Sequence, residues 1–253
     1  MPIAIVTGSD SGIGRATAVA LAEAGHDVGI TWRSDEDGAR ETAEECRGHG
    51  VRAEVRQLDL DDPARAADVV DELADALGGL DVLVNNAGGG NAGPALEASV
   101  EDFVTTLRAN VTGTFACTQR AAQRMVRAET PGRIVMVTSI HEHLPLPEAF
   151  DYVTAKHALG GLVKALALEL GPRGITVNAV APGQIATEMT GMDDTDPSSV
   201  PREGIPIGRP GDAREIAAMI LALVGPGSGY TTGASLIVDG GLGLMGPALG
   251  NDT

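Results

Sequence analysis

Short apolar runs alternate along this chain with longer stretches whose apolar residues recur every three or four positions. Continuous apolar strands separated by helices are typical of a parallel sheet that is covered on both faces. The pattern therefore predicts an α/β fold, a single doubly wound domain over residues 1–253 with about seven strands and helices on both faces. The apolar runs are Ile3–Val6, Val28–Thr31, Val51–Leu58, Val82–Val84, Ile134–Thr138, Ile175–Val180 and Ser235–Val238, and the helical stretches begin near Gly12, Asp35, Pro63, Val100, Phe150 and Asp212.

One long irregular segment, residues 187–206, interrupts this alternation. It is rich in Gly, Pro, Asp and Ser, and its centre is the acidic run Asp193-Asp194-Thr195-Asp196. Loops of this length are commonly active-site lids or disordered segments. Because the segment follows the end of a predicted strand, where such sheets bind ligands, we interpret it as a substrate lid that is mobile without ligand.

Composition and charge limit the partners that the chain can have. The formal net charge of −17 argues against nucleic-acid and anionic-membrane binding, because both need a cationic surface. No run of about 18 apolar residues is present, so no membrane span is expected. The first residues, Met1–Thr7, lack the basic region of a signal peptide. We therefore expect a cytoplasmic globular protein whose partner is a small molecule.

A glycine-rich segment joins the first predicted strand to the first predicted helix. Residues 7–14 read TGSDSGIG, with glycines at positions 8, 12 and 14. Glycines at such a junction permit a tight turn and let backbone N–H groups approach a pyrophosphate at the helix N-terminus. Glycines also occur in ordinary turns, so the placement between a strand and a helix is the feature that favours nucleotide binding.

Tyr152 and Lys156 are four residues apart in a predicted helix and therefore share one face. A phenol titrates near a pKa of about 10, and a nearby cation lowers that value, which makes the group usable as an acid or base. The same spacing also occurs by chance on ordinary helix surfaces. The pair gains weight from the glycine-rich segment and from Ser139, which lies thirteen positions before Tyr152.

Several motifs stand in order over residues 2 to about 241, and together they resemble the short-chain dehydrogenase/reductase family. They are TGxxxGIG at 7–14, Asn85-Asn86-Ala87-Gly88, Asn110, Ser139, Tyr152, Lys156 and Pro182-Gly183. The run Ser139-Ile-His-Glu142 is similar to bacterial glucose 1-dehydrogenases, and the wider pattern through Pro147 to an uncharacterised bacterial oxidoreductase branch. The resemblance implies a Rossmann-type fold and an oxidoreductase that transfers a hydride between a nicotinamide and a small ketone or secondary alcohol of the diketone, sugar or polyol type.

The resemblance also implies roles for four catalytic residues. Tyr152 would be the general acid or base, and Lys156 would lower its pKa and bind the nicotinamide ribose. Ser139 would donate a hydrogen bond to the substrate oxygen, where negative charge develops. Asn110 would hold a water behind Lys156, although an amide that bends or caps a helix is the alternative for this residue.

A larger set of residues is implied to bind the cofactor. Asp59 would accept a hydrogen bond from the adenine amino group, although it also suits a helix N-cap ahead of Pro63. The full set is Gly8, Ser11, Gly12, Ile13, Gly14, Arg33, Asp59, Leu60, Asn86, Ala87, Gly88, Tyr152, Lys156, Pro182, Gly183, Ile185 and Thr187.

The choice between NAD and NADP depends on the end of the second predicted strand. An acidic residue there would hold the ribose 2′-hydroxyl and select NAD, but this chain has Trp32 followed by Arg33. A guanidinium suits a 2′-phosphate. Ser11 stands where many NADP-using relatives carry a basic residue, and the acidic run 35–37 dilutes the positive potential. We expect NADP(H) to be preferred and NAD(H) to be tolerated.

Two histidines alternate with a glutamate directly after Ser139, as His141-Glu142-His143. The sequence shows no further ligands at zinc-like spacing, so we predict no metal site. Polar contacts with the substrate and simple structural hydrogen bonds remain as the two interpretations of these three residues.

Two other functions compete with the small-ketone oxidoreductase, and one assembly is expected. A 3-oxoacyl thioester reductase is disfavoured by the acidic surface, because an acyl carrier protein is itself acidic. A regulatory nucleotide-binding protein without catalysis is disfavoured by the intact catalytic set. The resemblance implies a homotetramer built from the helices at about 101–127 and 150–170, through small residues expected on their outer faces: Ala116, Ala155, Ala158, Gly160 and Gly161.

Overall fold

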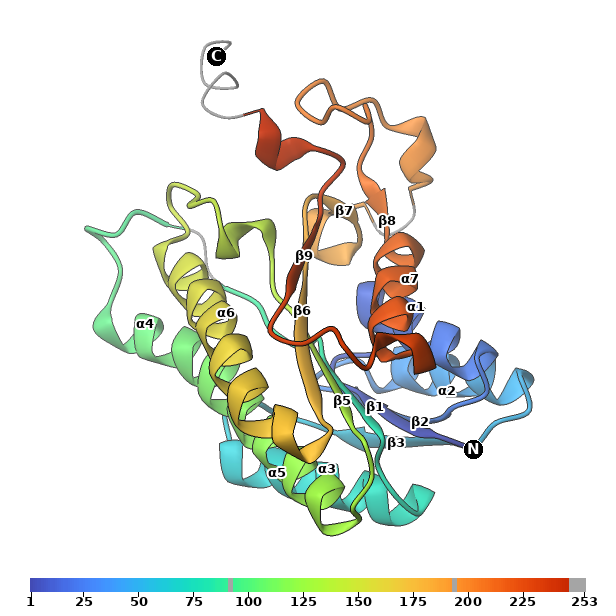
Figure 1. Ribbon diagram of the computed structural model, residues 1–253. Coiled ribbons are helices and arrows are strands. Elements are labelled where there is room, and N and C mark those ends of the chain that lie inside the picture. The colour runs from blue at the N-terminus through green and yellow to red at the C-terminus, as the bar shows by residue number, and fades with distance from the viewer. Residues whose placement is uncertain (91–92, 193–194, 246–253) are drawn as a thin grey trace.

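The computed structural model describes residues 1–90, 93–192 and 195–245 and contains one seven-stranded sheet in the order β3-β2-β1-β4-β5-β6-β9 (Figure 1). Every neighbouring pair in this sheet is parallel. The strands are β1 (Ile3–Val6), β2 (Asp27–Trp32), β3 (Ala53–Gln57), β4 (Val82–Asn85), β5 (Arg133–Val137), β6 (Thr176–Pro182) and β9 (Ser235–Val238). The predicted doubly wound, Rossmann-type α/β fold is confirmed, and the strand boundaries differ from the predicted ones by at most two residues.

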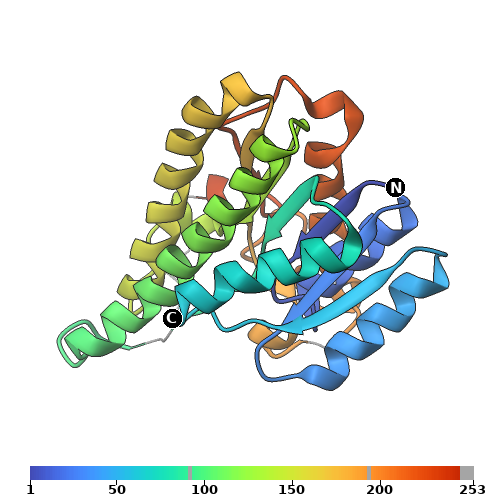
Figure 2. The ribbon, with the colours of Figure 1, turned by 90° about the horizontal axis from the view of Figure 1, so that it is seen from below.

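Helices cover both faces of the sheet (Figures 1 and 2). One layer contains α1 (Gly12–Glu23), α2 (Glu36–Gly48) and α7 (Ala213–Val224). The other contains α3 (Pro63–Leu77), α5 (Thr114–Arg127) and α6 (Phe150–Leu170), with α4 (Val100–Leu107) against α6. The sheet therefore separates two hydrophobic cores.

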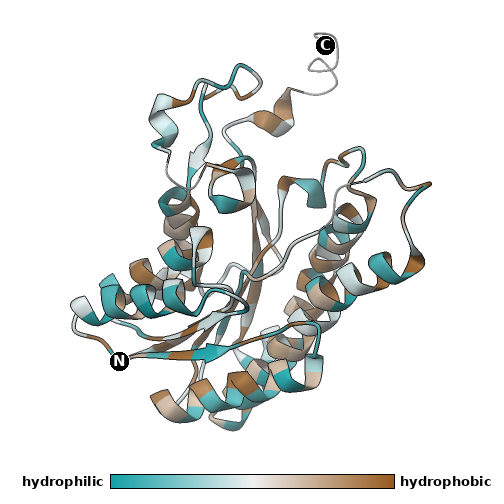
Figure 3. Ribbon diagram, turned by 180° about the vertical axis from the view of Figure 1, so that it is seen from behind, coloured by the Kyte–Doolittle hydropathy of each residue, from teal (hydrophilic) through white to brown (hydrophobic). Residues whose placement is uncertain are grey.

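The strands supply alternate side chains to these two cores. In β1, Ala4 and Val6 pack with the α1, α2 and α7 layer, whereas Ile5 packs with the α3, α5 and α6 layer. This alternation follows from the two-residue period of a strand, and it explains why a strand buried on both faces reads as an unbroken apolar run. Figure 3 shows hydrophobic residues along the central strands and on parts of the helices.

Strand order reverses between β1 and β4, which pair through Val6 and Val84. After β1 the chain continues to β2 on one side of this point, and after β4 it continues to β5 on the other. The loops that follow β1 and β4 therefore diverge and leave a crevice at the carboxyl edge of the sheet, where open α/β sheets bind ligands.

The helix expected at about 101–127 is interrupted. A π-helical segment, Arg108–Gly113, separates α4 from α5 and contains Asn110. Such bulges are uncommon and often occur at functional sites. Residue periodicity alone does not reveal this interruption, because the apolar spacing changes by only one position.

The lid segment has more structure than the sequence indicates. Short strands β7 (Ile185–Ala186) and β8 (Gly211–Asp212) pair in parallel at its two ends, and single 3-10 turns occupy Glu188–Thr190 and Pro197–Ser199. Met192 and Ile205 are buried. The segment is therefore not irregular throughout, while Asp193 and Asp194 of its acidic centre lie outside the described residues.

Candidate active site

The glycine-rich segment is fixed against the loop that follows β4. The Thr7 hydroxyl accepts hydrogen bonds from the backbone N–H groups of Asn86 (2.9 Å) and Ala87 (3.0 Å), and the Asn86 side chain donates to the Gly8 carbonyl at 2.8 Å. A Cβ atom at Gly14 would lie 1.9 Å from the Gly8 carbonyl oxygen. Glycine is therefore required at position 14 so that α1 can approach this loop.

The N-terminus of α1 opens onto the crevice. Ser11 occupies the N-cap position without a side-chain capping bond, and Gly12 has the positive φ of 52° that glycine tolerates. A Cβ at Gly12 would meet the Thr187 side chain at 3.3 Å, so the lid begins directly above this turn. Backbone N–H groups at a helix start form a site suited to phosphate.

A cleft of about 740 Å³ follows the carboxyl ends of β1 to β4. Eleven of the residues implied to bind the cofactor line it: Gly8, Ser11, Gly12, Ile13, Arg33, Asp59, Leu60, Asn86, Ala87, Gly88 and Thr187. Of the others, Gly14 lies behind the loop, Pro182 and Ile185 are buried, and Gly183 packs against Asp239, where a Cβ would lie 2.7 Å from its Cα.

The cleft also has lining residues that the sequence did not single out for binding. They are Asp10, Trp32, Leu58, Asp61, Gly89, Gly90, Thr105, Thr106, Ala109, Glu188 and Met189. Gly89 and Gly90 directly follow the motif that ends at Gly88, and this run of glycines was the feature of the sequence that could have identified them. The α4 residues come from a helix that carries no binding motif, so only the fold brings them here.

Acidic groups surround the one arginine of the cleft lining. Arg33 bonds to Asp61 at 3.2 Å and lies 3.5 Å from Asp59, and its side chain is 67% exposed. At the opposite end, burial raises the pKa of Asp10, and the nearby carboxylates Asp35 and Glu188 act in the same direction. The cation expected to contact a 2′-phosphate is therefore already paired.

Lys156 is buried beside Tyr152 on one face of α6, as the spacing predicted. Its Nζ lies 5.3 Å from the centre of the tyrosine ring and donates to the Val137 carbonyl oxygen at 3.2 Å. Burial lowers the pKa of Lys156 to about 8, while the Glu142 carboxylate acts to raise it. Loss of solvent disfavours the charged amine, so its protonation near neutrality depends on its neighbours.

The expected lowering of the Tyr152 pKa is not found. Burial raises the pKa of Tyr152, and hydrogen bonding with the Ser139 hydroxyl partly offsets this effect. Desolvation therefore outweighs this hydrogen bond, and it favours the protonated phenol. The phenol, the Ser139 hydroxyl and the ammonium are nevertheless gathered at the carboxyl edge of the sheet, as the motifs implied.

Three glycines connect this group to the cleft. A Cβ at Gly90 would lie 2.7 Å from the Tyr152 Cβ, and one at Gly88 would lie 3.7 Å from the Lys156 Nζ. Asn110 donates to the Gly89 carbonyl at 2.6 Å and accepts from the Gly89 N–H at 3.1 Å. The π-helical segment thus holds the glycine loop through Asn110, which also donates to the Thr106 carbonyl at 2.9 Å.

The three residues after Ser139 and Ile140 point to different surroundings. The His141 ring lies edge-on to Tyr152 with 6.3 Å between centroids, and its Nδ1 bonds to the Leu144 carbonyl at 2.9 Å. His143 is exposed, and its Nε2 lies 3.2 Å from the Ser235 hydroxyl. Glu142 is buried among protein hydroxyls, which favours a role inside the protein over direct contact with substrate.

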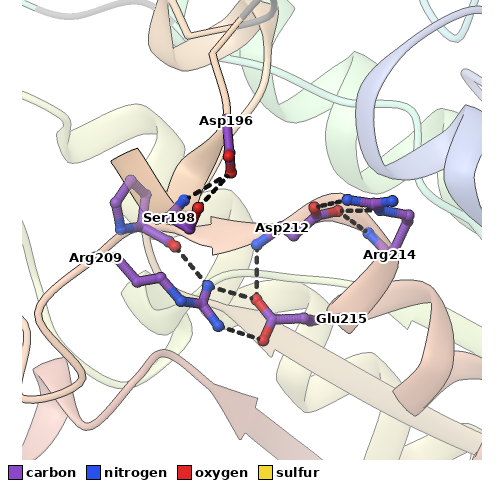
Figure 4. A network of polar contacts seen from close by, with 7 residues as sticks. Asp196, Ser198, Arg209, Asp212, Arg214 and Glu215 are labelled. Carbon is purple, nitrogen blue, oxygen red and sulfur yellow. Dashed lines mark hydrogen bonds and ion pairs between the residues drawn. The ribbon is translucent and has the colours of Figure 1, made fainter. Parts of the chain in front are cut away.

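Polar contacts fix the carboxyl end of the lid segment where it joins α7 (Figure 4). Arg209 donates to both carboxylate oxygens of Glu215 at 2.9 and 2.8 Å, and Asp212 accepts from the Arg214 backbone at 2.8 Å. The Arg209 pair lowers the pKa of Glu215 to about 2. These contacts hold the segment that follows the lid against the start of α7.

No group of three or more His, Cys, Asp or Glu suited to a metal ion occurs among the described residues. In the same part of the chain, no helix has the length and apolar content needed to cross a membrane.

Comparison with known proteins agrees with this geometry. The profile of a protein family described as "Enoyl-(Acyl carrier protein) reductase" matches residues 8–243. The chain is 51% identical over 245 residues to "Uncharacterized oxidoreductase YohF" of Escherichia coli, covering 97% of each chain. It is 37% identical over 246 residues to "Glucose 1-dehydrogenase" of Gluconobacter oxydans, covering 96% of this chain and 92% of the relative.

Solved structures show the same fold at high similarity. The acetoin dehydrogenase YohF from Salmonella typhimurium has a TM-score of 0.91 and 48% identity, covering 98% of this chain and 100% of the other. A short-chain dehydrogenase from Burkholderia cenocepacia in complex with NADP has a TM-score of 0.87 and 37% identity, covering 95% and 97%.

Proposed function

The chain belongs to the short-chain dehydrogenase/reductase family of oxidoreductases, and we propose that it interconverts a small ketone and its secondary alcohol with NADP(H) as the preferred cofactor. The proposal rests on one observation, namely that the cleft lies beside the side chains of Tyr152 and Lys156. Gly88 and Gly90 line the cleft, and Lys156 and Tyr152 lie directly beside these two glycines, so a ligand in the cleft would lie close to both side chains.

The cleft suits a dinucleotide because the glycines of its loop carry no side chains, so the backbone can approach the pyrophosphate closely. The pyrophosphate would meet the N–H groups at the start of α1, and the adenine would lie near Asp59 and Leu60. The nicotinamide end would lie between Gly88 and Thr187, ahead of Pro182, Gly183 and Ile185. When bound there, the nicotinamide supplies or accepts the hydride.

The chain's own residues would handle the proton and the developing charge. In the reductive direction, the Tyr152 phenol donates its proton to the carbonyl oxygen as negative charge builds there. The Ser139 hydroxyl donates a hydrogen bond to the same oxygen. The Lys156 ammonium then stabilises the phenolate, and Asn110 holds the loop beside which Lys156 lies.

Small hydroxyketones and diketones are the substrate class that we propose first. This assignment rests on the likeness to proteins named acetoin dehydrogenase, and sugars or polyols follow from the likeness to glucose 1-dehydrogenase. His141 adds a polar ring beside Tyr152, which suits a second oxygen next to the reacting carbon. The family description makes an acyl carrier protein substrate the alternative, and the acidic lining of the cleft opposes it.

An activity panel with one pair of matched variants tests the proposal. NADPH oxidation would be followed with diacetyl, acetoin, glucono-lactone and a 3-oxoacyl thioester, and NADP⁺ reduction with butanediol and glucose. Tyr152→Phe should lower kcat by at least about 100-fold while leaving NADPH binding unchanged. Tyr230→Phe is the control, because Tyr230 is the other tyrosine and is fully exposed.

Retention of more than about a tenth of the rate in Tyr152→Phe would contradict the catalytic assignment. Turnover of the thioester alone would transfer the function to the acyl carrier class, and NADPH binding without turnover of any substrate would favour a regulatory protein.

Assembly as a homotetramer and a cytoplasmic location complete the proposal. Ala158 and Gly161 are exposed on α6, and Val100 and Val104 are exposed on α4, so these helices offer an apolar surface for contact. Two of the residues predicted for this surface, Ala155 and Gly160, instead face the protein interior.

A further inference from the structure

Glu142 is a buried carboxylate for which the proposed reaction has no use. Its side chain is 4% exposed. The Thr138 hydroxyl donates to its Oε2 at 2.6 Å, and the Ser235 hydroxyl donates to the same oxygen at 2.9 Å. Burying a charge is costly unless it is hydrogen-bonded and paired. The two hydroxyls supply hydrogen bonds but no positive charge, so the positive charge that offsets the carboxylate must come from another residue.

The chain brings this carboxylate close to Lys156 in two ways. Lys156 and Gly160 share one face of α6, and a Cβ at Gly160 would lie only 2.3 Å from Glu142 Oε1. The carboxylate therefore lies against the helix one turn beyond the lysine. In addition, the consecutive residues Val137 and Thr138 bond the Lys156 ammonium and the Glu142 carboxylate respectively.

Few other charged groups face Glu142 in the described part of the chain. Its own turn contributes His143, whose Nε2 lies 3.7 Å from Oε1 and carries charge only when protonated. Thr138, directly after β5, and Ser235 in β9 contribute neutral hydroxyls. Helix α6 contributes Lys156, whose ammonium group can offset the carboxylate charge at neutral pH.

We propose that Glu142 is a positioning residue that keeps Lys156 protonated at the pH at which the enzyme works. The proposal rests on the proposed function, because the charge of Lys156 matters for the reaction only if Tyr152 transfers the proton. Burial drives the lysine toward its neutral form, and a carboxylate in the same poorly solvated region opposes that change. The glycine at 160 is then explained as well, since any side chain there would displace the carboxylate.

The charge of Lys156 can be measured directly because the chain has only two lysines. The other, Lys164, is exposed and serves as an internal reference in NMR spectra of protein labelled with [¹³C]lysine. Glu142→Gln keeps the size and hydrogen-bonding oxygen of the side chain but removes its charge. Glu169→Gln is the control, because it removes an exposed charge from the same helix.

In Glu142→Gln, the titration midpoint of Lys156 should fall by about one pH unit, the lower end of the effect of a close opposite charge. The midpoint should stay unchanged in Glu169→Gln. An unchanged Lys156 midpoint in Glu142→Gln would overturn the proposal. If this variant does not fold, the wild-type protein still decides, because a Lys156 midpoint below about 6.5 would mean that the lysine is mostly uncharged at neutral pH despite Glu142, and this result would overturn the proposal.

Kinetics supply the second readout. A fall of the midpoint from about 8 to about 7 lowers the charged fraction at pH 8 from about one half to about one tenth. For Glu142→Gln we therefore expect kcat about fivefold lower at pH 8 and within twofold of wild type at pH 6. Equal losses at both pH values would indicate a merely structural role and overturn the proposal.

The outcomes separate this inference from the proposed function. A fully active Tyr152→Phe variant would contradict the function whatever the NMR shows. An inactive Tyr152→Phe variant together with an unmoved Lys156 midpoint would contradict the role of Glu142 alone.

Discussion

The proposed preference for NADP(H) would require Arg33 to exchange one ionic partner for another. The guanidinium already bonds to Asp61 at 3.2 Å and lies 3.5 Å from Asp59. A charge-assisted hydrogen bond to a 2′-phosphate contributes about 1.5–3 kcal/mol, and an exposed ion pair contributes about 0.2–1 kcal/mol. Because NADPH binding replaces the ion pair with the bond to the phosphate, Arg33 should contribute a net of about 1–2 kcal/mol to NADPH binding, or about 5- to 30-fold in Kd.

Arg33→Ala should therefore raise the Kd for NADPH by about 5- to 30-fold and change the Kd for NADH by less than about twofold. The fluorescence of the bound nicotinamide gives both constants in one titration format. Arg40→Ala is the matched control, because Arg40 is an equally exposed arginine (67%) that pairs with Glu36 on α2. Equal losses for the two cofactors would refute a contact between Arg33 and the 2′-phosphate.

The same reasoning predicts an opposite effect at Asp61. Asp61→Asn removes a competing carboxylate, so the Kd for NADPH should fall by about two- to fivefold, which corresponds to the worth of an exposed ion pair. NADH binding should hardly change. A weaker affinity for NADPH in Asp61→Asn would show that Asp61 orients Arg33 for the phosphate and does not compete with it.

Three further expectations concern the loop, stability and assembly. Gly14→Ala should lower the affinity for NADPH at least about tenfold and reduce Tm, because the new Cβ would lie 1.9 Å from the Gly8 carbonyl oxygen. Gly48→Ala is the control, because a Cβ at Gly48 would have no atom within 4 Å, and it should change neither the affinity nor Tm. Burial opposes ionisation of Asp27, but hydrogen bonds from Arg52 lower its pKa below the usual value. Asp27→Asn should therefore lower the free energy of unfolding, measured with urea at pH 7, by about 1–2 kcal/mol. The difference in stability between the variant and the wild type should shrink as the pH falls below about 4, where the carboxyl group of the unfolded chain is protonated. Light scattering should give about four times the 25.8 kDa chain mass, and a monomer at micromolar concentration would contradict the tetramer.

The layers of the fold were predictable because burial on both faces removes polar residues from the strands. The run Ile3–Val6 is an example, since all four residues are buried and Ala4, Ile5 and Val6 each belong to one of the two cores. The positions of Gly8 and Gly14 were predictable for a related reason, because close approach of two backbone segments leaves glycine as the only residue that fits.

Features that depend on distant side chains could not be predicted in this way. Glu142 reads as one polar residue in a polar run, and only the fold places it against Gly160. The pairing of Arg33 with Asp61 joins residues 28 positions apart. The lid packs through Met192 and Ile205, two isolated apolar residues whose burial no periodic pattern indicates.

Burial favours the uncharged form of both Tyr152 and Lys156, because it raises the pKa of the phenol and lowers the pKa of the amine. For the phenol this is an advantage in the reductive direction, because the acid must hold its proton until the carbonyl oxygen gains charge. For the amine it is a liability, because a neutral lysine does not stabilise the phenolate that remains. A lysine that is buried in this way therefore needs a negative charge nearby, and Glu142 is a buried carboxylate that the structure places there.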